Sequence, residues 1–345
     1  MVELSLSTSS RRITEKHLSE FVRASYGLNG HAQRLGGEKD DNFVLTTEYG
    51  EAYLVKIAHP NEDPEVVTLQ TSVLEYLRRV APELPVQRVV RNLEGLSDAN
   101  VAEGPLAGRR IRVTSYLEGT LLRTVGSTPN LRREIGASAA RLDQVLQRFD
   151  HVGLRRSLLW DISQAQKLLP LLDELPATEE RRLLLRELNR FVTEVLPRLS
   201  AQRSQAVHND LSIDNLLVAT GGGSLAGILD FGDVIHTQLV NEVAIAASYQ
   251  LSNSPDPVNE AIEVLVGYHA TNPLTDDEIG LLPSLIVGRV LMWVIIPKWR
   301  SARMPENNAY VLRNAERSWS LLLTLLDLSL VDFADRLRRA CSDVR

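Results

Sequence analysis

The sequence predicts an α+β fold with two lobes, a small antiparallel β lobe over residues 1–117 and a larger, mainly helical lobe over residues 118–345. Three observations support this prediction. Alternating apolar residues typical of strands are concentrated in the first part of the chain, and apolar residues at helical spacing dominate the second part. Between the predicted helices, the stretch 207–233 has two short apolar runs around three glycines that begin at Gly221, a pattern typical of a β-hairpin. With 44% hydrophobic residues, the chain can bury a sizeable core.

Composition narrows the functional classes. The formal charge of −6 argues against a nucleic-acid-binding surface, because phosphate backbones require clustered Lys and Arg. The single cysteine, Cys341, cannot form an intramolecular disulfide, so nothing in the sequence asks for an oxidising compartment. The N-terminus lacks the continuous apolar core of a signal peptide, and the apolar segment 279–296 is interrupted by Pro283 and Arg289, which favours a buried helix over a membrane span. We expect a cytoplasmic protein with no nucleic-acid and no membrane partner; the sequence does not indicate its oligomeric state.

The N-terminal lobe is predicted from strands and two helices. Residues 14–26 carry apolar residues at helical spacing, with Thr14 as the N-cap and Gly27 at the end. Residues 64–80 form a second amphipathic helix, closed by Pro82. The predicted strands, which together make a small antiparallel sheet, are 42–47, 52–57, 86–90 and 110–116.

Lys56 lies in the second of these strands, in the segment AYLVKI. A strand lysine can reach nucleotide phosphates as a point charge, although a solvated lysine is the commoner structural alternative. Its position before a helix and well before the central hairpin favours the phosphate role. The preceding loop GGEKDDNF has neither a Walker spacing nor G-x-G-x-x-G, so it is only compatible with a nucleotide.

The second part of the chain is predicted to be helical. The expected helices are 130–149, 179–196, 239–251, 258–269, 279–296 and 309–326. The helix 179–196 is rich in Arg, but interleaved glutamates indicate a solvated face of mixed charge rather than a nucleic-acid surface.

The central stretch 207–233 carries the residues that suggest a reaction. His208, Asp210 and Asn215 follow the order H-x-D-x-x-x-x-N, and Asp230 precedes Phe-Gly after the second apolar run. We expect the hairpin to bring Asp210, Asn215 and Asp230 together, and oxygen-bearing side chains suit Mg²⁺ that also keeps water and phosphate ligands. In the kinase scheme one Asp accepts the proton of the attacking hydroxyl, while an Asn and the Asp before Phe-Gly hold Mg²⁺. This scheme assigns the first role to Asp210 and the second to Asn215 and Asp230.

A purely structural interpretation exists for each of these residues alone. Asp210 and Asn215 are common turn residues, His208 would be a buried hydrogen-bonded histidine, and Asp230 a cap at a strand end. Turn chemistry does not demand this ordered combination around a hairpin, so the set as a whole favours phosphoryl transfer.

The segments HNDLSIDN and GILDFGD resemble the aminoglycoside phosphotransferase family, a branch of the protein-kinase-like fold that phosphorylates small-molecule alcohols. The continuation DFGDVIHTQLVNEVAIAASY, with EKDDNFVL and AYLVKIAHP, is most similar to the hydroxylysine kinase-like phosphotransferases. The resemblance covers residues 35–319, and its catalytic motifs are specific for the superfamily. It implies a two-lobed, protein-kinase-like fold with a nucleotide-binding N-terminal lobe and a catalytic, substrate-binding C-terminal lobe.

The resemblance also implies roles for single residues. Asp210 matches the family's catalytic aspartate, Asn215 and Asp230 match its Mg²⁺ ligands, and Lys56 matches its phosphate lysine. Tyr116 and Leu117, in the expected linker between the lobes, would flank the base of the nucleotide, ATP or GTP.

Two positions depart from the family pattern. Asn209 stands where the family usually has glycine. We therefore expect the backbone of Asn209 to lie outside the left-handed region, where a side chain is unfavourable. Thr68 stands where such kinases often place the helix glutamate that pairs with the phosphate lysine, and Glu65, one turn earlier, is the expected replacement.

The identity of the acceptor must be inferred from residues of the helical lobe, because the motif residues require only a positioned hydroxyl. Arg289 and Trp293 share one predicted helix and, with Trp299, are expected to line a pocket over Asp210, where Arg289 would grip a substrate carboxylate. The structural alternative is that Arg289 pairs with an internal acid and the tryptophans fill the core.

Two further acids follow the metal aspartate. Asp233 and Glu242 would attract a substrate ammonium, or else Asp233 caps the next helix and Glu242 braces the catalytic loop. The resemblance favours an amino alcohol or hydroxy-amino acid as acceptor, with an aminoglycoside as the second choice. A pseudokinase that only binds nucleotide is the alternative from another class, opposed by intact Asp210, Asn215, Asp230 and Lys56.

Overall fold

The computed structural model describes residues 13–36, 40–252, 254, 256–303, 312 and 314–343. The chain divides into two compact units. The first comprises Met1–Gly119 with two later segments, His151–Gly153 and Ala226–Gly232, and the second comprises Thr120–Asp150, Leu154–Leu225 and Asp233–Arg345. The sequence predicts a boundary after residue 117. In the structure the first unit continues to Gly119 and also includes the later segment that carries Asp230.

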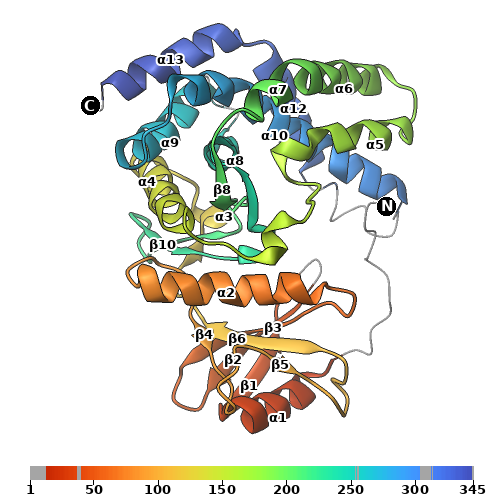
Figure 1. Cartoon of the computed structure of the whole chain (residues 1–345), viewed down its shortest axis with the longest axis vertical. Helices are drawn as coiled ribbons and strands as arrows, with labels where there is room; N and C mark the ends of the chain where they lie inside the picture. The colour runs from red at the N-terminus through yellow and green to blue at the C-terminus, as the bar shows by residue number, and fades with distance from the viewer. Residues whose placement is uncertain are drawn as a thin grey trace. The chain divides into compact units, whose positions relative to one another are not determined.

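The first unit contains an antiparallel sheet in the order β1-β2-β3-β6-β4, with β5 also pairing with β6 (Figure 1). Its strands are β1 (Gly30–Arg34), β2 (Asp41–Thr47), β3 (Ala52–Ile57), β4 (Val89–Val90), β5 (Ala99–Asn100) and β6 (Arg110–Ser115). The pairs Lys56↔Asn42 and Lys56↔Arg112 are in register across the three central strands.

The two faces of this sheet differ in character. Side chains alternate between faces along a strand, so Phe43, Val55 and Val113 lie on one face and are fully buried against α1 (Glu15–Tyr26). The opposite face carries the polar row formed by Asn42, Lys56 and Arg112. The sheet therefore presents a row of polar side chains on a rigid, well-packed support.

The helices of the first unit are bounded as their sequences predict. Thr14 caps α1 by accepting a hydrogen bond from the His17 N–H, and Gly27 ends it in the left-handed conformation. Asp63 caps α2 (Pro64–Val80), whose buried face includes Val66, Leu69 and Gln70.

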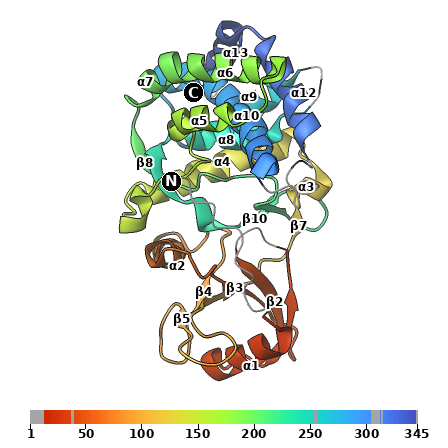
Figure 2. The ribbon, with the colours of Figure 1, turned by 90° about the vertical axis from the view of Figure 1, so that its right-hand side faces the viewer.

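The second unit is mainly helical (Figure 2). Its principal helices are α4 (Pro129–Leu146), α6 (Glu179–Arg190), α8 (Val240–Gln250), α9 (Pro257–Thr271), α10 (Asp276–Arg303), α12 (Ala315–Leu326) and α13 (Leu330–Ser342). Shorter pieces are α3 (Leu122–Val125), α5 (Leu169–Asp173), α7 (Leu196–Leu199) and a π-helical turn over Phe191–Val195. The pair α4 and α9 pack closely because Gly136 and Gly267 leave no side chain between their backbones.

Helix α10 lies among α5, α6, α8 and α12, as Figure 2 shows. It is the one helix in the described part of the chain that is long and apolar enough to cross a membrane, and 83% of its most apolar window is buried inside the protein. The expectation of a buried helix at 279–296 is therefore confirmed, although the helix extends further at both ends.

Short strands in the second unit position the central stretch. β8 (Ser204–Val207) pairs antiparallel with β11 (Ile235–Gln238), and Val207 faces Ile235 immediately before His208. β9 (Leu216–Val218) pairs with β7 (Thr120–Leu121). After β9, the glycine-containing turn is closed by the hydrogen bond from Ala219 N–H to Ser224 O, which leads into β10 (Leu225–Ile228).

Several predicted elements differ from the structure. The strand expected at 86–90 is reduced to Val89–Val90, because Val86 makes only an isolated bridge to Ile228. The strand Gly30–Arg34 was not predicted, since Ala32 is its single buried residue and the sequence shows no alternation there. The helix expected at 309–326 begins at Ala315, and part of its expected start lies outside the described residues, as do residues 37–39 of the glycine-containing loop.

Candidate active site

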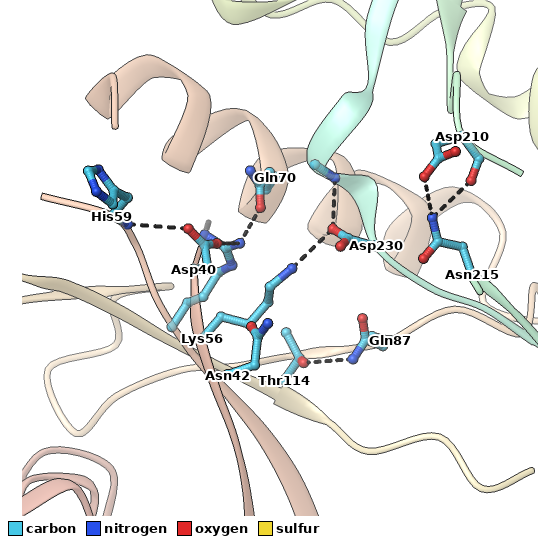
Figure 3. Close-up of polar contacts among 12 residues, drawn as sticks. Asp40, Asn42, Lys56, His59, Gln70, Gln87, Thr114, Asp210, Asn215 and Asp230 are labelled. Carbon is cyan, nitrogen blue, oxygen red and sulfur yellow. Dashed lines mark hydrogen bonds and ion pairs between the residues drawn. The ribbon is translucent and has the colours of Figure 1, made fainter. Parts of the chain in front are cut away.

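Lys56 and Asp230 form an ion pair in the first unit (Figure 3). Lys56 Nζ lies 3.0 Å from Asp230 Oδ1, and the lysine side chain is 13% exposed. Asp230 follows β10, which is anchored by the hydrogen bond from Ile228 N–H to Pro85 O. Asp230 adopts a left-handed backbone with φ of +55°, and its Oδ1 also accepts a hydrogen bond from the Gly232 N–H. A non-glycine residue in this conformation is strained, which the surrounding contacts must offset.

A buried arginine lies beside Lys56 on the same face of the sheet. Arg112 is 3% exposed and stands in register with Lys56. Its guanidinium lies 3.3 Å from Asp40 Oδ2 and donates to Gln70 Oε1, while Asp40 Oδ1 accepts the His59 N–H. The arginine therefore ties α2, through Gln70, to the sheet and to the segment before β2.

The helix acid expected to pair with Lys56 makes no such contact in the described part of the chain. The Thr68 hydroxyl donates to the Pro64 carbonyl of its own helix. Glu65 is exposed in the first turn of α2, and within the described residues no ion pair joins it to Lys56. The α2 side chain closest to the turn after Asp230 is that of Gln70, whose Nε2 is 3.9 Å from the position that a Cβ on Gly232 would take.

Sequence reasoning missed Gln70 and Arg112, although a signal for Gln70 was present. Gln70 lies three, four and seven residues before Val73, Leu74 and Leu77, on the apolar face of α2. A polar residue on a buried helix face must find a partner, and Arg112 is that partner.

Tyr116 and Leu117 follow the end of β6. The Tyr116 N–H donates to Ala52 O, and the tyrosine is 44% exposed. In the segment before β4, Gln87 Nε2 donates to the Thr114 hydroxyl at 3.2 Å (Figure 3). The role of Tyr116 and Leu117 beside a nucleotide base stays a prediction.

Asp210 and Asn215 form the central contact of the second unit. The Asn215 amide Nδ2 donates to Asp210 Oδ2 at 2.6 Å and to the Asp210 carbonyl at 3.0 Å (Figure 3). His208 is fully buried, and its Nδ1 accepts the Asp210 N–H. Because the amide nitrogen of Asn215 is used by Asp210, its oxygen is the atom left to act as a ligand for a hard cation.

Glu242 braces the loop that carries Asp210. It is fully buried in α8, and its Oε2 accepts the Asn209 N–H at 2.7 Å. Burial raises the pKa of the Glu242 carboxyl to about 8, and the nearby charge of Asp210 adds to the increase, whereas the Asn209 N–H opposes it. Of the two roles considered for Glu242, bracing of the catalytic loop is supported by a direct contact, the hydrogen bond from the Asn209 N–H.

The expected backbone at Asn209 is wrong. Asn209 has φ of +67°, inside the left-handed region. Asparagine occupies this region more readily than most non-glycine residues, and the hydrogen bond to Glu242 holds the backbone there. The position thus keeps the conformation that glycine would adopt.

Two donors approach the second carboxylate oxygen of Asp210, and aromatic rings surround them. The Tyr249 hydroxyl lies 3.4 Å and Arg289 Nη2 3.5 Å from Asp210 Oδ1. The Arg289 guanidinium lies over the rings of Trp160 and Tyr249, and the Tyr249 ring is 4.6 Å from that of Trp293. Burial and the Asp210 charge raise the pKa of Tyr249 to about 12, so its hydroxyl stays protonated and can donate.

Two other residues lie elsewhere than expected. Trp299 is buried, and its indole N–H donates to Glu174 Oε2 at 2.9 Å, at the surface of the helical unit rather than to Asp210. Asp233 does not cap the next helix, because β11 intervenes and the residue before α8 is Leu239. Within the described residues, no group of three or more His, Cys, Asp or Glu side chains is arranged to hold a metal.

Comparison of the sequence with known proteins identifies its family and relatives. The model of the phosphotransferase enzyme family matches residues 31–284. The hydroxylysine kinase of Mus musculus is 28% identical over 340 residues, which cover 91% of this chain and 90% of the relative.

Solved structures have a similar fold. The amicoumacin kinase hAmiN in complex with AMP-PNP, Ca²⁺ and Ami has a TM-score of 0.66 at 16% identity, covering 89% of this chain and 94% of that chain. A microcompartment-associated aminopropanol kinase has a TM-score of 0.64 at 17% identity, covering 91% and 99%. The resemblance expected from the sequence motifs and the predicted α+β, protein-kinase-like fold are confirmed. This chain therefore belongs to the phosphotransferase enzyme family and is a small-molecule kinase.

Proposed function

We propose that this kinase transfers the γ-phosphate of ATP or GTP to the hydroxyl of an amino alcohol or hydroxy-amino acid, with Asp210 as the catalytic base. The observation that carries the proposal is the fixed Asp210 carboxylate, which is held at one oxygen by Asn215 and approached at the other by Tyr249. A carboxylate with a fixed direction can accept a proton from an acceptor hydroxyl that lies within hydrogen-bond distance of it.

Each unit contributes its own residues to the reaction. In the first unit, Lys56 would bind nucleotide phosphates, and Asp230 would bind Mg²⁺ when its pair with Lys56 opens to admit the nucleotide. In the second unit, Asn215 would offer its amide oxygen to Mg²⁺. Bound Mg²⁺ neutralises charge on the phosphate oxygens. We propose nucleotide binding for the first unit and acceptor binding for the second.

The chemical step moves one proton and one phosphoryl group. The acceptor hydroxyl gives its proton to Asp210 as its oxygen forms a bond to the γ-phosphorus, and the bond from that phosphorus to the β-phosphate oxygen breaks. The nucleoside diphosphate leaves with the electron pair. Asp210 then releases the proton to solvent.

We propose that the acceptor carries an amine. The Trp293 ring lies beside that of Tyr249, and aromatic faces attract cations. Because Arg289 already lies over the Tyr249 ring and beside Asp210, Asp233 stays the predicted contact for the ammonium. The named relatives include a hydroxylysine kinase and an aminopropanol kinase, whose names both denote amine-bearing alcohols.

A phosphate-transfer screen tests the proposal. Amino alcohols, hydroxy-amino acids, sugars and aminoglycosides are each offered with ATP and with GTP in the presence of Mg²⁺. Turnover with the first two classes supports the proposal. Turnover confined to aminoglycosides would replace the acceptor class, and nucleotide binding without any turnover would indicate a pseudokinase.

Two substitutions test the proposed residue roles. Asp210→Asn is expected to abolish turnover and leave nucleotide affinity nearly intact, because it removes the base and keeps the side-chain shape. Asp230→Asn is expected to weaken Mg²⁺-dependent nucleotide binding, measured by calorimetry with and without Mg²⁺. Asp335→Asn, which removes a surface pair with Arg338, is the matched control and should behave as wild type. Equal turnover in wild type and Asp210→Asn would remove Asp210 from the mechanism.

A further inference from the structure

Arg289 is a buried cation that contacts the proposed catalytic base. The residue is 1% exposed in the middle of α10. Its Nη1 donates to the Trp160 carbonyl, and its Nη2 lies 3.5 Å from Asp210 Oδ1. A buried guanidinium is costly unless its charge and its N–H groups are matched; these contacts match the charge and both terminal nitrogens.

The contacts of Arg289 leave little of it for a substrate. Recognition of a carboxylate by a guanidinium usually uses two parallel N–H groups. One terminal nitrogen faces the Trp160 carbonyl and the other faces Asp210, while the two ring systems of Trp160 and Tyr249 lie 5.3 Å and 5.8 Å from the guanidinium carbon. Only Nε lacks a partner in the described chain, and it is buried. Because Arg289 is 1% exposed, a substrate carboxylate could reach its remaining N–H groups only by displacing the groups packed around the guanidinium.

The same contacts define what Arg289 does for Asp210. Asn215 holds Asp210 Oδ2, so the plane of the carboxylate is set by Asn215 on one side and by Arg289 with Tyr249 on the other. The guanidinium thus helps to fix the direction of the base.

We propose that Arg289 is a positioning residue that orients Asp210, and that it does not bind a carboxylate of the acceptor. This inference rests on the proposed function and deepens it, because it makes the acceptor carboxylate dispensable at this position. It predicts that amino alcohols and hydroxy-amino acids use Arg289 equally.

A pair of matched acceptors distinguishes the two roles. Arg289→Lys and Arg289→Met are compared with wild type on a hydroxy-amino acid and on the amino alcohol that lacks only its carboxylate. We expect kcat to fall roughly 100-fold in Arg289→Met with both acceptors, since a displaced base costs about that much. KM should change by less than about threefold for both, and Arg289→Lys should recover part of kcat because it keeps the charge.

Controls separate this inference from folding and from the proposed function. Arg303→Met removes a partly exposed arginine of the same helix, paired with Glu174, and should retain wild-type kinetics. An increase in KM confined to the carboxylate-bearing acceptor, with kcat unchanged, would overturn the positioning role. If Arg289→Met does not fold, Arg289→Lys carries the same comparison.

If wild type phosphorylates no acceptor, the proposed function fails. The positioning role is then measured directly from crystal structures of wild type, Arg289→Lys and Arg289→Met. An unchanged Asp210 carboxylate in Arg289→Met would refute it, and a rotated or displaced carboxylate would support it.

Discussion

Asn209→Gly should stabilise the second unit, although it removes a fully buried side chain. Asn209 has φ of +67°, where a side chain costs about 1 kcal/mol and glycine costs nothing. Its Oδ1 and Nδ2 are both buried, and neither has a hydrogen-bond partner in the described chain. Removing such atoms recovers roughly 1–3 kcal/mol of lost hydration.

Two effects oppose this gain. Glycine increases the conformational entropy of the unfolded chain, which costs about 0.5–1 kcal/mol. Loss of the buried side chain leaves space that costs about 1 kcal/mol. The balance favours Asn209→Gly over wild type by about 1 kcal/mol, and Asn209→Ala, which keeps a Cβ at positive φ, should be about 1 kcal/mol less stable than Asn209→Gly.

Tryptophan fluorescence in urea measures this difference in the correct part of the molecule. All four tryptophans, at positions 160, 293, 299 and 319, belong to the second unit, as does Asn209. The matched control is Asn272→Gly, at φ of −132° and with its Nδ2 donating to the Tyr268 hydroxyl, which should lose stability. If Asn209→Gly unfolds at lower urea than wild type, or if Asn209→Ala exceeds Asn209→Gly, the account of strain and unpaired polar atoms is wrong.

Two further predictions concern buried charges. Arg112→Met should lower the stability of the first unit by about 3 kcal/mol and weaken nucleotide binding, because Asp40 and Gln70 lose their partner. Urea unfolding measures the stability, and calorimetry measures the nucleotide affinity. An unchanged affinity would show that Arg112 does not support the nucleotide site. The Glu242 carboxyl has a pKa of about 8 in the folded protein and 4.5 in the unfolded chain. Between these two pH values the folded protein keeps a proton on Glu242 that the unfolded chain has released. Wild-type stability should therefore fall as pH rises from about 5 to about 8. Glu242→Gln should remove part of this fall, and the buried Asp143, whose pKa is also raised by burial, accounts for a further part. Parallel pH curves of urea midpoints for wild type and Glu242→Gln would contradict the assignment.

Much of the first unit could be predicted because its strands carry a regular signal. In β2 and β3 one face is buried against α1 and the other is polar, so Phe43 and Val55 alternate with Asn42 and Lys56 in the sequence. The edge strand β1 lacks this signal, because only Ala32 is buried.

The candidate site was predictable where its residues lie close in the sequence. Asp210 and Asn215 belong to one loop, and their spacing already suggests their contact. The neighbours of Asp210 from other elements were harder to find. Tyr249 lies in α8, a helix buried nearly all round, so hydrophobic periodicity does not indicate the direction of any one side chain.

The non-glycine residues with a left-handed backbone could not be predicted from the sequence pattern. Asn209 and Asp230 are the non-glycine residues with positive φ in the described chain, and both belong to the motif segments. Their conformations follow from tertiary contacts, such as the bond from Asn209 N–H to Glu242, rather than from local preference.

The sheet of the first unit, with one apolar and one polar face, limits where residues can be inserted into the chain. A single inserted residue within β3 would turn Lys56 toward α1 and expose its apolar neighbours, so the chemistry and the core would be lost together. The turn between Thr47 and Ala52 is different, because Gly50 has open space around it and Tyr49 is 92% exposed. Insertions should be tolerated at that tip, which makes it a suitable position for a purification peptide or a fluorescent label.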